Sequence, residues 1–128
     1  MASLNMDGPF KYNKDTINEL IPNGAIGNYA LGHIEDNAFI VEYVGRSDEN
    51  LLTRIPHSIG KYTHFKVSLA SSPFEAYQKE CTNWHDFGGE DGYLDNKIHP
   101  DKPDGIKLAF CPICAKRIID KLNKRKNH

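Results

Sequence analysis

Hydrophobic and polar residues alternate along three stretches of the chain, which is the pattern of β-strands that bury one face. The first two stretches run from Gly27 to Ile34 and from Ala38 to Val44, and the third runs from Tyr62 to Ala70. The residues between the first two, Glu35 to Asn37, are polar and turn-prone. The alternation therefore predicts a β-hairpin followed by a third strand.

The length of the hairpin loop decides which residues of its two strands lie opposite each other. If Glu35, Asp36 and Asn37 form the loop, Tyr29 faces Tyr43 directly, with Cβ atoms about 4.5–5.5 Å apart. Two phenols would then lie side by side on one face of the sheet. On the pattern alone, such an aromatic pair more often packs than carries a function.

A helix is predicted after the third strand. Ser72 is a typical N-cap, Pro73 suits the first helical position, and Glu75 is the expected partner in a capping box. The apolar positions 74, 77, 81 and 84 then form one helical stripe, which Gly88 and Gly89 end.

Three further segments complete the predicted layout. A short helix is expected over residues 48–55, ended by Pro56, and a basic helix over about residues 115–124. Residues 1–26 carry only one clear helical turn, near 15–20, and are expected to be an extension packed on the domain. The order β-β-α-β-α with a final helix predicts a small α+β domain in which helices flank a three-stranded antiparallel sheet.

The length and composition of the chain fit one soluble domain. With 128 residues there is room for a single modest core, which we expect in residues 27–100, followed by a metal knuckle and helix in 101–128. Hydrophobic residues make up 39% and charged residues 26%, as in ordinary globular proteins. Without a long apolar run or a signal-like start, the chain is expected to be cytoplasmic and to make no membrane contact.

Charge is distributed unevenly along the chain. The formal net charge of −1 gives no general case for nucleic-acid binding. From Lys116 onward, however, six Lys or Arg residues stand against one acid, so the preceding segment carries ten basic and sixteen acidic residues. A basic tail of this kind can hold a phosphate backbone, and a solvated helix end explains it equally well.

Cysteine and histidine spacing predicts a zinc site. Cys111 and Cys114 form a two-residue-gap knuckle, and Cys81 and His85 lie four apart on one helix face. These four residues make a Cys₃His set that tetrahedral structural zinc prefers, with His99 as the reserve ligand if His85 points elsewhere. Cys81 also lies on the apolar stripe, so it can equally be a core residue.

The two-cysteine knuckle has one competing interpretation, that of a thiol oxidoreductase. A redox Cys-x-x-Cys normally follows a strand and opens a helix in a βαβ frame. The segment before Cys111 is instead a loop rich in Pro, Asp and Lys, which favours metal binding.

Five sequence features follow one another in a fixed order: Gly27-Asn28-Tyr29, Tyr43-Val44-Gly45, Arg54, Glu75–Glu80 and Asn96. Together they resemble the paired tripeptides, the helix arginine, the glutamate-bearing helix and the closing asparagine of the GIY-YIG endonucleases. Asn28 stands where the family usually has Ile, and Pro56 shortens the first helix relative to the common pattern. The resemblance covers about residues 27–100.

The resemblance implies hydrolysis of phosphodiester bonds in DNA, with one catalytic Mg²⁺ or Mn²⁺ held by Glu80. It implies that Arg54 pairs with the phosphate through its planar fork and that Tyr29 and Tyr43 orient or deprotonate water. Asn96 would complete the site. His57 and His64 are candidate assistants, although a surface histidine is the more frequent explanation for either one.

The candidate nucleic-acid contacts are Arg46, Lys116, Arg117, Lys124 and Arg125. A protein partner for targeting is also expected, because many nucleases of this type depend on a separate recognition domain.

The two candidate sites share one helix. Glu80 precedes Cys81 and so points about 100° away from it around the helix axis. A zinc clip would therefore hold the helix from behind while Glu80 faces the cleft, and with four protein ligands the zinc would be structural. The main alternative to a nuclease is a non-catalytic, zinc-stabilised module that binds nucleic acid or protein on the same fold.

Overall fold

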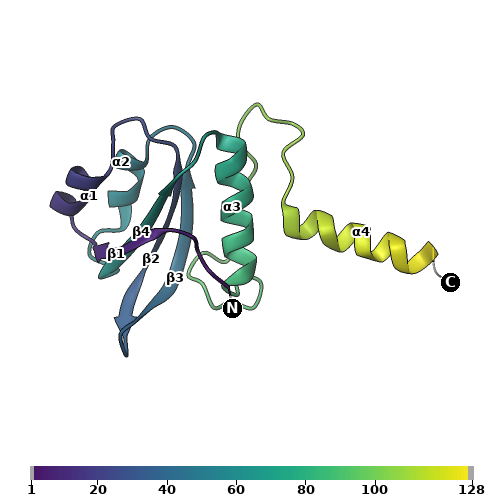
Figure 1. Cartoon of the computed structure of the whole chain (residues 1–128), viewed down its shortest axis with the longest axis horizontal. Coiled ribbons are helices and arrows are strands. Elements are labelled where there is room, and N and C mark those ends of the chain that lie inside the picture. The colour runs from purple at the N-terminus through teal and green to yellow at the C-terminus, as the bar shows by residue number, and fades with distance from the viewer. Residues whose placement is uncertain (1, 127–128) are drawn as a thin grey trace.

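A computed structural model describes residues 2–126 of the chain, with side chains as far as Lys124. In Figure 1 a single β-sheet has α1 and α2 on one face and α3 on the other, and α4 projects away from this body. The elements in chain order are β1 (Asp7–Lys11), α1 (Lys14–Leu20), β2 (Gly27–Glu35), β3 (Ala38–Ser47), α2 (Leu51–Arg54), the 3₁₀ turn η1 (Ile55–Ser58), β4 (His64–Leu69), α3 (Pro73–Asp86) and α4 (Pro112–Lys126). The α+β class is thus confirmed.

The sheet has four antiparallel strands, in the order β1-β4-β2-β3, so the prediction of three strands is wrong. The additional strand, β1, comes from the segment expected to be an extension. Its residues are exposed apart from Phe10, which is half-buried against Phe65 with ring centroids 5.6 Å apart. A strand with one packed side chain has no alternating pattern, so alternation of hydrophobic and polar residues does not predict it.

The first 26 residues also complete the core. Tyr12, Ile17 and Ile21 are buried in the same hydrophobic cluster as Tyr29 and Leu31 of the central strand. The helix that carries Ile17 begins at Asn13, whose side chain accepts a hydrogen bond from the backbone of Thr16. The segment therefore forms one wall of the core.

The hairpin closes with a two-residue turn, Asp36-Asn37, and the predicted pairing of Tyr29 with Tyr43 is wrong. Both turn residues have positive φ, 51° and 65°, which suits a tight hairpin turn between strands of right-handed twist. A bulge between Leu31 and Gly32 then leaves Glu42 as an extra residue in β3. As a result Tyr29 lies opposite Gly45.

The helix after β4 follows the prediction closely. It runs from Pro73 to Asp86, and the side chain of its N-cap Ser72 accepts a hydrogen bond from the backbone N–H of Glu75. The reciprocal bond differs from a capping box, because the Glu75 carboxylate accepts from Ser71 rather than from Ser72. Its apolar stripe packs toward the sheet through Trp84, which clusters with residues of β2 and β3.

The last helix is longer than predicted at both ends and lies apart from the sheet (Figure 1). Its apolar residues Ile118, Ile119 and Leu122 are all more than half exposed. Among the helices in residues 2–126, none has the length and apolarity needed to cross a bilayer.

Candidate functional site

A cleft of about 640 Å³ opens at the free edge of β3. Its lining residues come from the end of β3, the turn after it, α2, α3 and the loop 96–104. Four of the five residues singled out by the resemblance line this cleft: Tyr43, Arg54, Glu80 and Asn96. Arg46, predicted to bind nucleic acid, lines it as well.

The fifth residue, Tyr29, lies beneath the cleft and is buried. Its ring crosses the strand next to it at Gly45, where an added Cβ would lie 2.5 Å from Tyr29 Cζ and 2.6 Å from its hydroxyl. Only glycine leaves room for this crossing. The ring also stacks on Tyr43, with centroids 6.1 Å apart. The two phenols are neighbours as predicted, although they are offset along the sheet and not directly opposite.

The surroundings of the Tyr29 hydroxyl favour its neutral form. Burial raises the pKa of Tyr29 well above its usual value of 10, the nearby Tyr43 raises it further, and Arg54 lowers it only in part. A neutral phenol can orient Arg54 or a water molecule through hydrogen bonds. It does not serve as a base that removes a proton.

Arg46 joins two carboxylates in the cleft. Its Nη1 donates to Glu80 Oε1 at 2.6 Å and its Nε donates to Asp48 Oδ1 at 2.9 Å. The guanidinium also lies 5.1 Å from the centroid of the Tyr77 ring, in a cation–π contact. Burial raises the pKa of Glu80, and the charge of Arg46 acts in the opposite direction.

Glu80 reaches the cleft from the opposite face of the sheet to the two tyrosines and Arg54. Tyr29 packs with the residues of α1 and α2, whereas α3, which carries Glu80, covers the other face. The two sets meet because β3 is an edge strand and the cleft wraps around its free side. Asn28 fixes the position of α3 relative to β2. Its buried side chain donates to the carbonyl of Ala76 at 2.8 Å, one turn before Glu80.

Asn96 closes the free edge of β3. Its side-chain nitrogen donates to the carbonyl of Val44 at 2.8 Å, and its side-chain oxygen accepts from the N–H of the same residue at 3.4 Å. Its own carbonyl accepts from the indole nitrogen of Trp84 at 2.8 Å. The side chain thus acts as a substitute strand partner for Val44, and it holds the start of the loop 96–104 against β3.

The two histidines named as assistants do not line the cleft. His57 is exposed in the 3₁₀ turn after α2. His64 begins β4, where its Nδ1 lies 2.9 Å from the hydroxyl of Thr63. The structure therefore brings neither imidazole to the site at the edge of β3.

A second cluster lies where α3, the loop after it and the start of α4 meet. His85, His99, Cys111 and Cys114 each place one ligand atom within 4.8 Å of all the others, and the group could hold a metal ion such as zinc. This differs from the predicted set, since His99, the reserve ligand, stands where Cys81 was expected. Cys81 is instead fully buried in a small hydrophobic cluster with Tyr77 and Ala109. Burial raises the pKa of its thiol to about 12.

Both imidazoles present the same nitrogen to the cluster. The Nε2 atoms of His85 and His99 lie 3.6 and 3.7 Å from Cys114 Sγ. Their Nδ1 atoms are occupied elsewhere, in His85 by Glu90 and in His99 by the carbonyl of Pro100 at 2.9 Å. Two imidazole nitrogens and two sulfurs are a donor set that suits tetrahedral zinc.

The thiols of the knuckle lie next to donors that favour a thiolate at one of them. Burial alone would raise the pKa of Cys111, but hydrogen bonds from the Cys114 backbone, from His99 and from neighbouring thiols lower it to about 6. Burial and the proximity of Cys111 raise the pKa of Cys114. These surroundings favour loss of the first proton from Cys111 rather than from Cys114.

Comparisons of the chain with protein-family models, curated proteins and solved structures each gave no match. The chain has two candidate sites that share the loop 96–104. The cleft gathers hard oxygen donors and arginines, which suit a phosphate and a hard cation. The cluster beside it gathers sulfur and imidazole nitrogen.

Proposed function

We propose that the chain is a metal-dependent phosphodiester hydrolase that acts on DNA, of the GIY-YIG type. The observation that carries the proposal is the meeting of Tyr43, Arg54 and Glu80 in one cleft, with the buried Tyr29 ring stacked on Tyr43. These are the residue types that phosphodiester hydrolysis needs: a cation for the phosphate, an oxygen ligand for a metal, and groups that orient water.

Glu80 would hold the catalytic Mg²⁺ or Mn²⁺. Its side chain is 12% exposed, so it is open to the cleft, and Mg²⁺ commonly binds through one or two carboxylates with water and phosphate oxygens completing its shell. Asp48 is a second carboxylate within reach of the same guanidinium. Arg46 already places one positive charge between them, which supports a cation site here. The bound metal would polarise the phosphoryl oxygen as a Lewis acid.

Arg54 would bind the scissile phosphate. Its side chain is exposed at the end of α2, and a hydrogen bond with the neutral hydroxyl of Tyr29 would hold it in place. A planar fork fixed in this way can donate two parallel hydrogen bonds to a phosphate and stabilise the charge that develops during hydrolysis. Tyr43, which lines the cleft, would orient the attacking water.

Arg46 would have to leave Glu80 before a metal enters. Its ion pair with Glu80 occupies the carboxylate oxygen that the metal needs. Once released, the guanidinium would stay in the cleft, where it can contact the DNA backbone. We infer that Arg46 has two successive partners, first the carboxylates and then phosphate.

The basic face of α4 would supply further contacts with the DNA backbone. Lys116, Lys121 and Lys124 are exposed on this helix. Arg117 is engaged with Glu90, and the side chain of Arg125 lies outside the described residues. Because α4 starts at the cysteine knuckle, next to the wall of the cleft, its charges are near enough to attract the same substrate.

The His₂Cys₂ cluster would hold a structural zinc ion. His99 belongs both to the cluster and to the wall of the cleft. Four protein ligands leave no position for a reacting water, so a metal here would fix the loop 96–104 against α3 and take no part in the chemistry.

A plasmid-nicking assay with Mg²⁺ or Mn²⁺ tests the proposal. We expect the zinc-loaded chain to nick supercoiled DNA, and Glu80→Gln to lower the rate about 100-fold or more, because it removes the charged ligand of the metal. Glu19→Gln, on the exposed face of α1, is the matched control and should cleave like the native chain. No cleavage by the native chain, or equal cleavage by Glu80→Gln, would refute the catalytic claim.

One observation favours the alternative of a non-catalytic binding module. The cleft is rimmed by acidic residues, Asp48, Glu49, Asp101 and Asp104, and Glu80 is already paired with Arg46. Binding of Mn²⁺, followed by electron paramagnetic resonance, separates the two functions. The hydrolase binds one Mn²⁺ beyond its zinc and loses it in Glu80→Gln, whereas the module binds none.

A further inference from the structure

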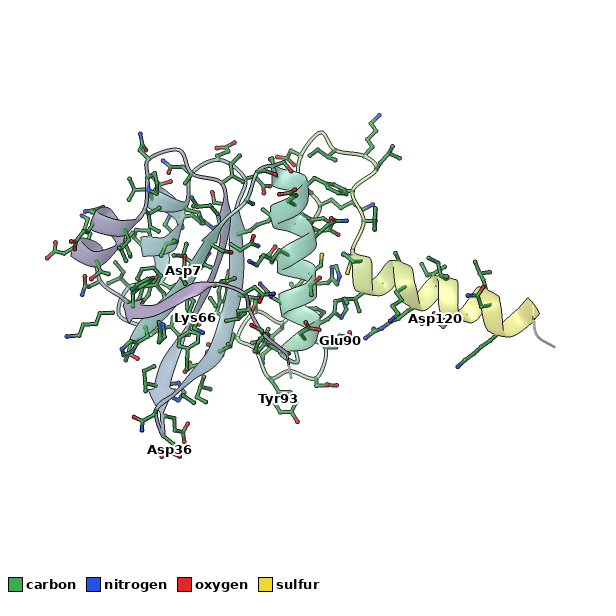
Figure 2. The ribbon with its side chains drawn as sticks, in the orientation of Figure 1. Asp7, Asp36, Lys66, Glu90, Tyr93 and Asp120 are labelled. Atoms are coloured by element: carbon green, nitrogen blue, oxygen red, sulfur yellow. The ribbon has the colours of Figure 1, made fainter. Side chains whose placement is uncertain are left out.

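A chain of contacts runs outward from the metal-binding cluster to α4. Nδ1 of His85 contacts the carboxylate of Glu90, which lies in the loop after α3. The same carboxylate accepts hydrogen bonds from Arg117 of α4, at 3.0 Å from Nη1 and 2.9 Å from Nη2. In Figure 2 Glu90 lies beside the C-terminal end of α3, on the side that faces α4. The end of α3, the loop directly after it and the distant helix α4 therefore meet at one carboxylate.

The contact with Glu90 decides which nitrogen of His85 can bind a metal. A carboxylate accepts a hydrogen bond from the N–H at Nδ1, so the ring proton stays at Nδ1 and Nε2 keeps its free electron pair. That Nε2 lies 3.6 Å from Cys114 Sγ, inside the cluster. A carboxylate that orients a metal-binding histidine in this way is a frequent outer-shell partner in zinc sites, and it also raises the basicity of the ring.

We propose that Glu90 and Arg117 form the outer shell of a zinc centre made by His85, His99, Cys111 and Cys114. Glu90 fixes the tautomer and orientation of His85, and Arg117 holds Glu90 in place. Cys114 and Arg117 lie three residues apart on one face of α4. Zinc binding would therefore connect α4 to α3 in two ways, through the shared metal ligands and through the ion pair of Glu90 with Arg117. This outer shell rests on the zinc site proposed above and does not depend on what the cleft binds or cleaves.

The second histidine supplies a comparison within the same centre. Nδ1 of His99 is bonded to the backbone carbonyl of Pro100. A side-chain substitution cannot remove this acceptor, so a change at Glu90 affects one of the two histidine ligands. The expected loss of affinity is for this reason partial.

The size of the effect distinguishes an outer-shell role from an ordinary surface ion pair. The side chains of Glu90 and Arg117 are 40% and 55% exposed. A pair this open contributes little by itself, so its loss alone would leave metal affinity almost unchanged. Loss of an outer-shell partner typically weakens metal binding about 10- to 100-fold.

The affinity of the full chain for Zn²⁺, measured by competition with a chelator of known affinity, tests the proposal. We expect Glu90→Ala to bind Zn²⁺ about 10-fold to 100-fold more weakly. Asp91→Ala is the matched control, because this neighbouring acid is exposed and should keep the native affinity. The Co²⁺-loaded proteins should show the tetrahedral thiolate spectrum in both variants, which checks that the four inner ligands remain.

A charge swap sharpens the test. Glu90→Arg combined with Arg117→Glu preserves an ion pair but places a cation at Nδ1 of His85, so we expect affinity no better than that of Glu90→Ala. Arg117→Met leaves Glu90 in place and should weaken binding by less, about threefold. Equal affinity of Glu90→Ala and Asp91→Ala would overturn the proposal, and so would recovery of native affinity in the swap. Circular dichroism of the zinc-loaded variants separates lost affinity from lost folding.

Discussion

The cleft at the edge of β3 and the His₂Cys₂ cluster share the loop 96–104, but they are built in opposite ways. The side chains of the cleft come from both faces of the sheet and hold one another through charge and aromatic contact, as Arg46 holds Glu80. The ligand atoms of the cluster carry no opposite charges of this kind and meet through sulfur contacts, such as those of Cys114 Sγ with the two imidazoles at 3.6 and 3.7 Å.

This difference indicates which of the two regions a bound metal would stabilise more. Where β3 and α3 line the cleft, protein contacts hold it, because the charge of Arg46 is compensated by the carboxylates of Asp48 and Glu80. The cluster places two thiol groups and two imidazoles together with little to gain from it without a metal. We therefore expect metal removal to disturb the cluster and the wall of the cleft first, and the rest of the sheet later.

The largest expected effect is the loss of a cluster cysteine. Cys114→Ser should abolish stoichiometric zinc binding and lower the free energy of unfolding by about 4 kcal/mol, as loss of a structural metal does. Cys81→Ala should keep the zinc and cost only about 1 kcal/mol, because it removes one small buried group. Metal analysis together with chemical denaturation measures both. Loss of zinc in Cys81→Ala would show that Cys81 is a zinc ligand, as the sequence predicted.

A smaller effect is expected where the cleft depends on a glycine. Gly45→Ala places a methyl group 2.5 Å from Cζ of Tyr29 and should cost about 1–3 kcal/mol of stability through overpacking. It should also slow DNA nicking, since the displaced phenol no longer supports Arg54. In a Tyr29→Ala background the same substitution should be nearly neutral, and a double-mutant cycle measures this coupling. Additive costs would show that the ring does not cross at Gly45.

The smallest expected effect concerns Glu75, in the first turn of α3. This helix carries residues of both regions. Hydrogen bonds from Ser71 lower the pKa of Glu75 below its ordinary value of 4.5 in the folded chain. The charged form is therefore favoured by folding, so its contribution is present above pH 4.5 and is lost as the pH falls through the lowered pKa. The stability difference between the native chain and Glu75→Gln should disappear in acid. A difference that grows in acid would contradict this sign.

The sequence alone determined the elements that have a strong local signal. The hairpin, β4 and α3 follow from alternation, from the helical stripe and from the cap at Ser72, because each of these depends on neighbours within a few residues. The same holds for the pair Cys111 and Cys114, whose spacing is local. The resemblance to the GIY-YIG endonucleases also named four of the residues that line the cleft, namely Tyr43, Arg54, Glu80 and Asn96.

Only the tertiary structure decided the features that depend on distant contacts. Strand β1 is held on the sheet by the packing of Phe10 against Phe65. The register of the hairpin depends on a bulge at Glu42, which the alternation of hydrophobic and polar residues does not predict. The fourth ligand is His99 because the loop after α3 folds back to α4, whereas helix geometry alone favours Cys81 equally. Side chains that meet through the path of a long loop leave no periodic trace in the sequence, and the geometry of both sites was set by such meetings.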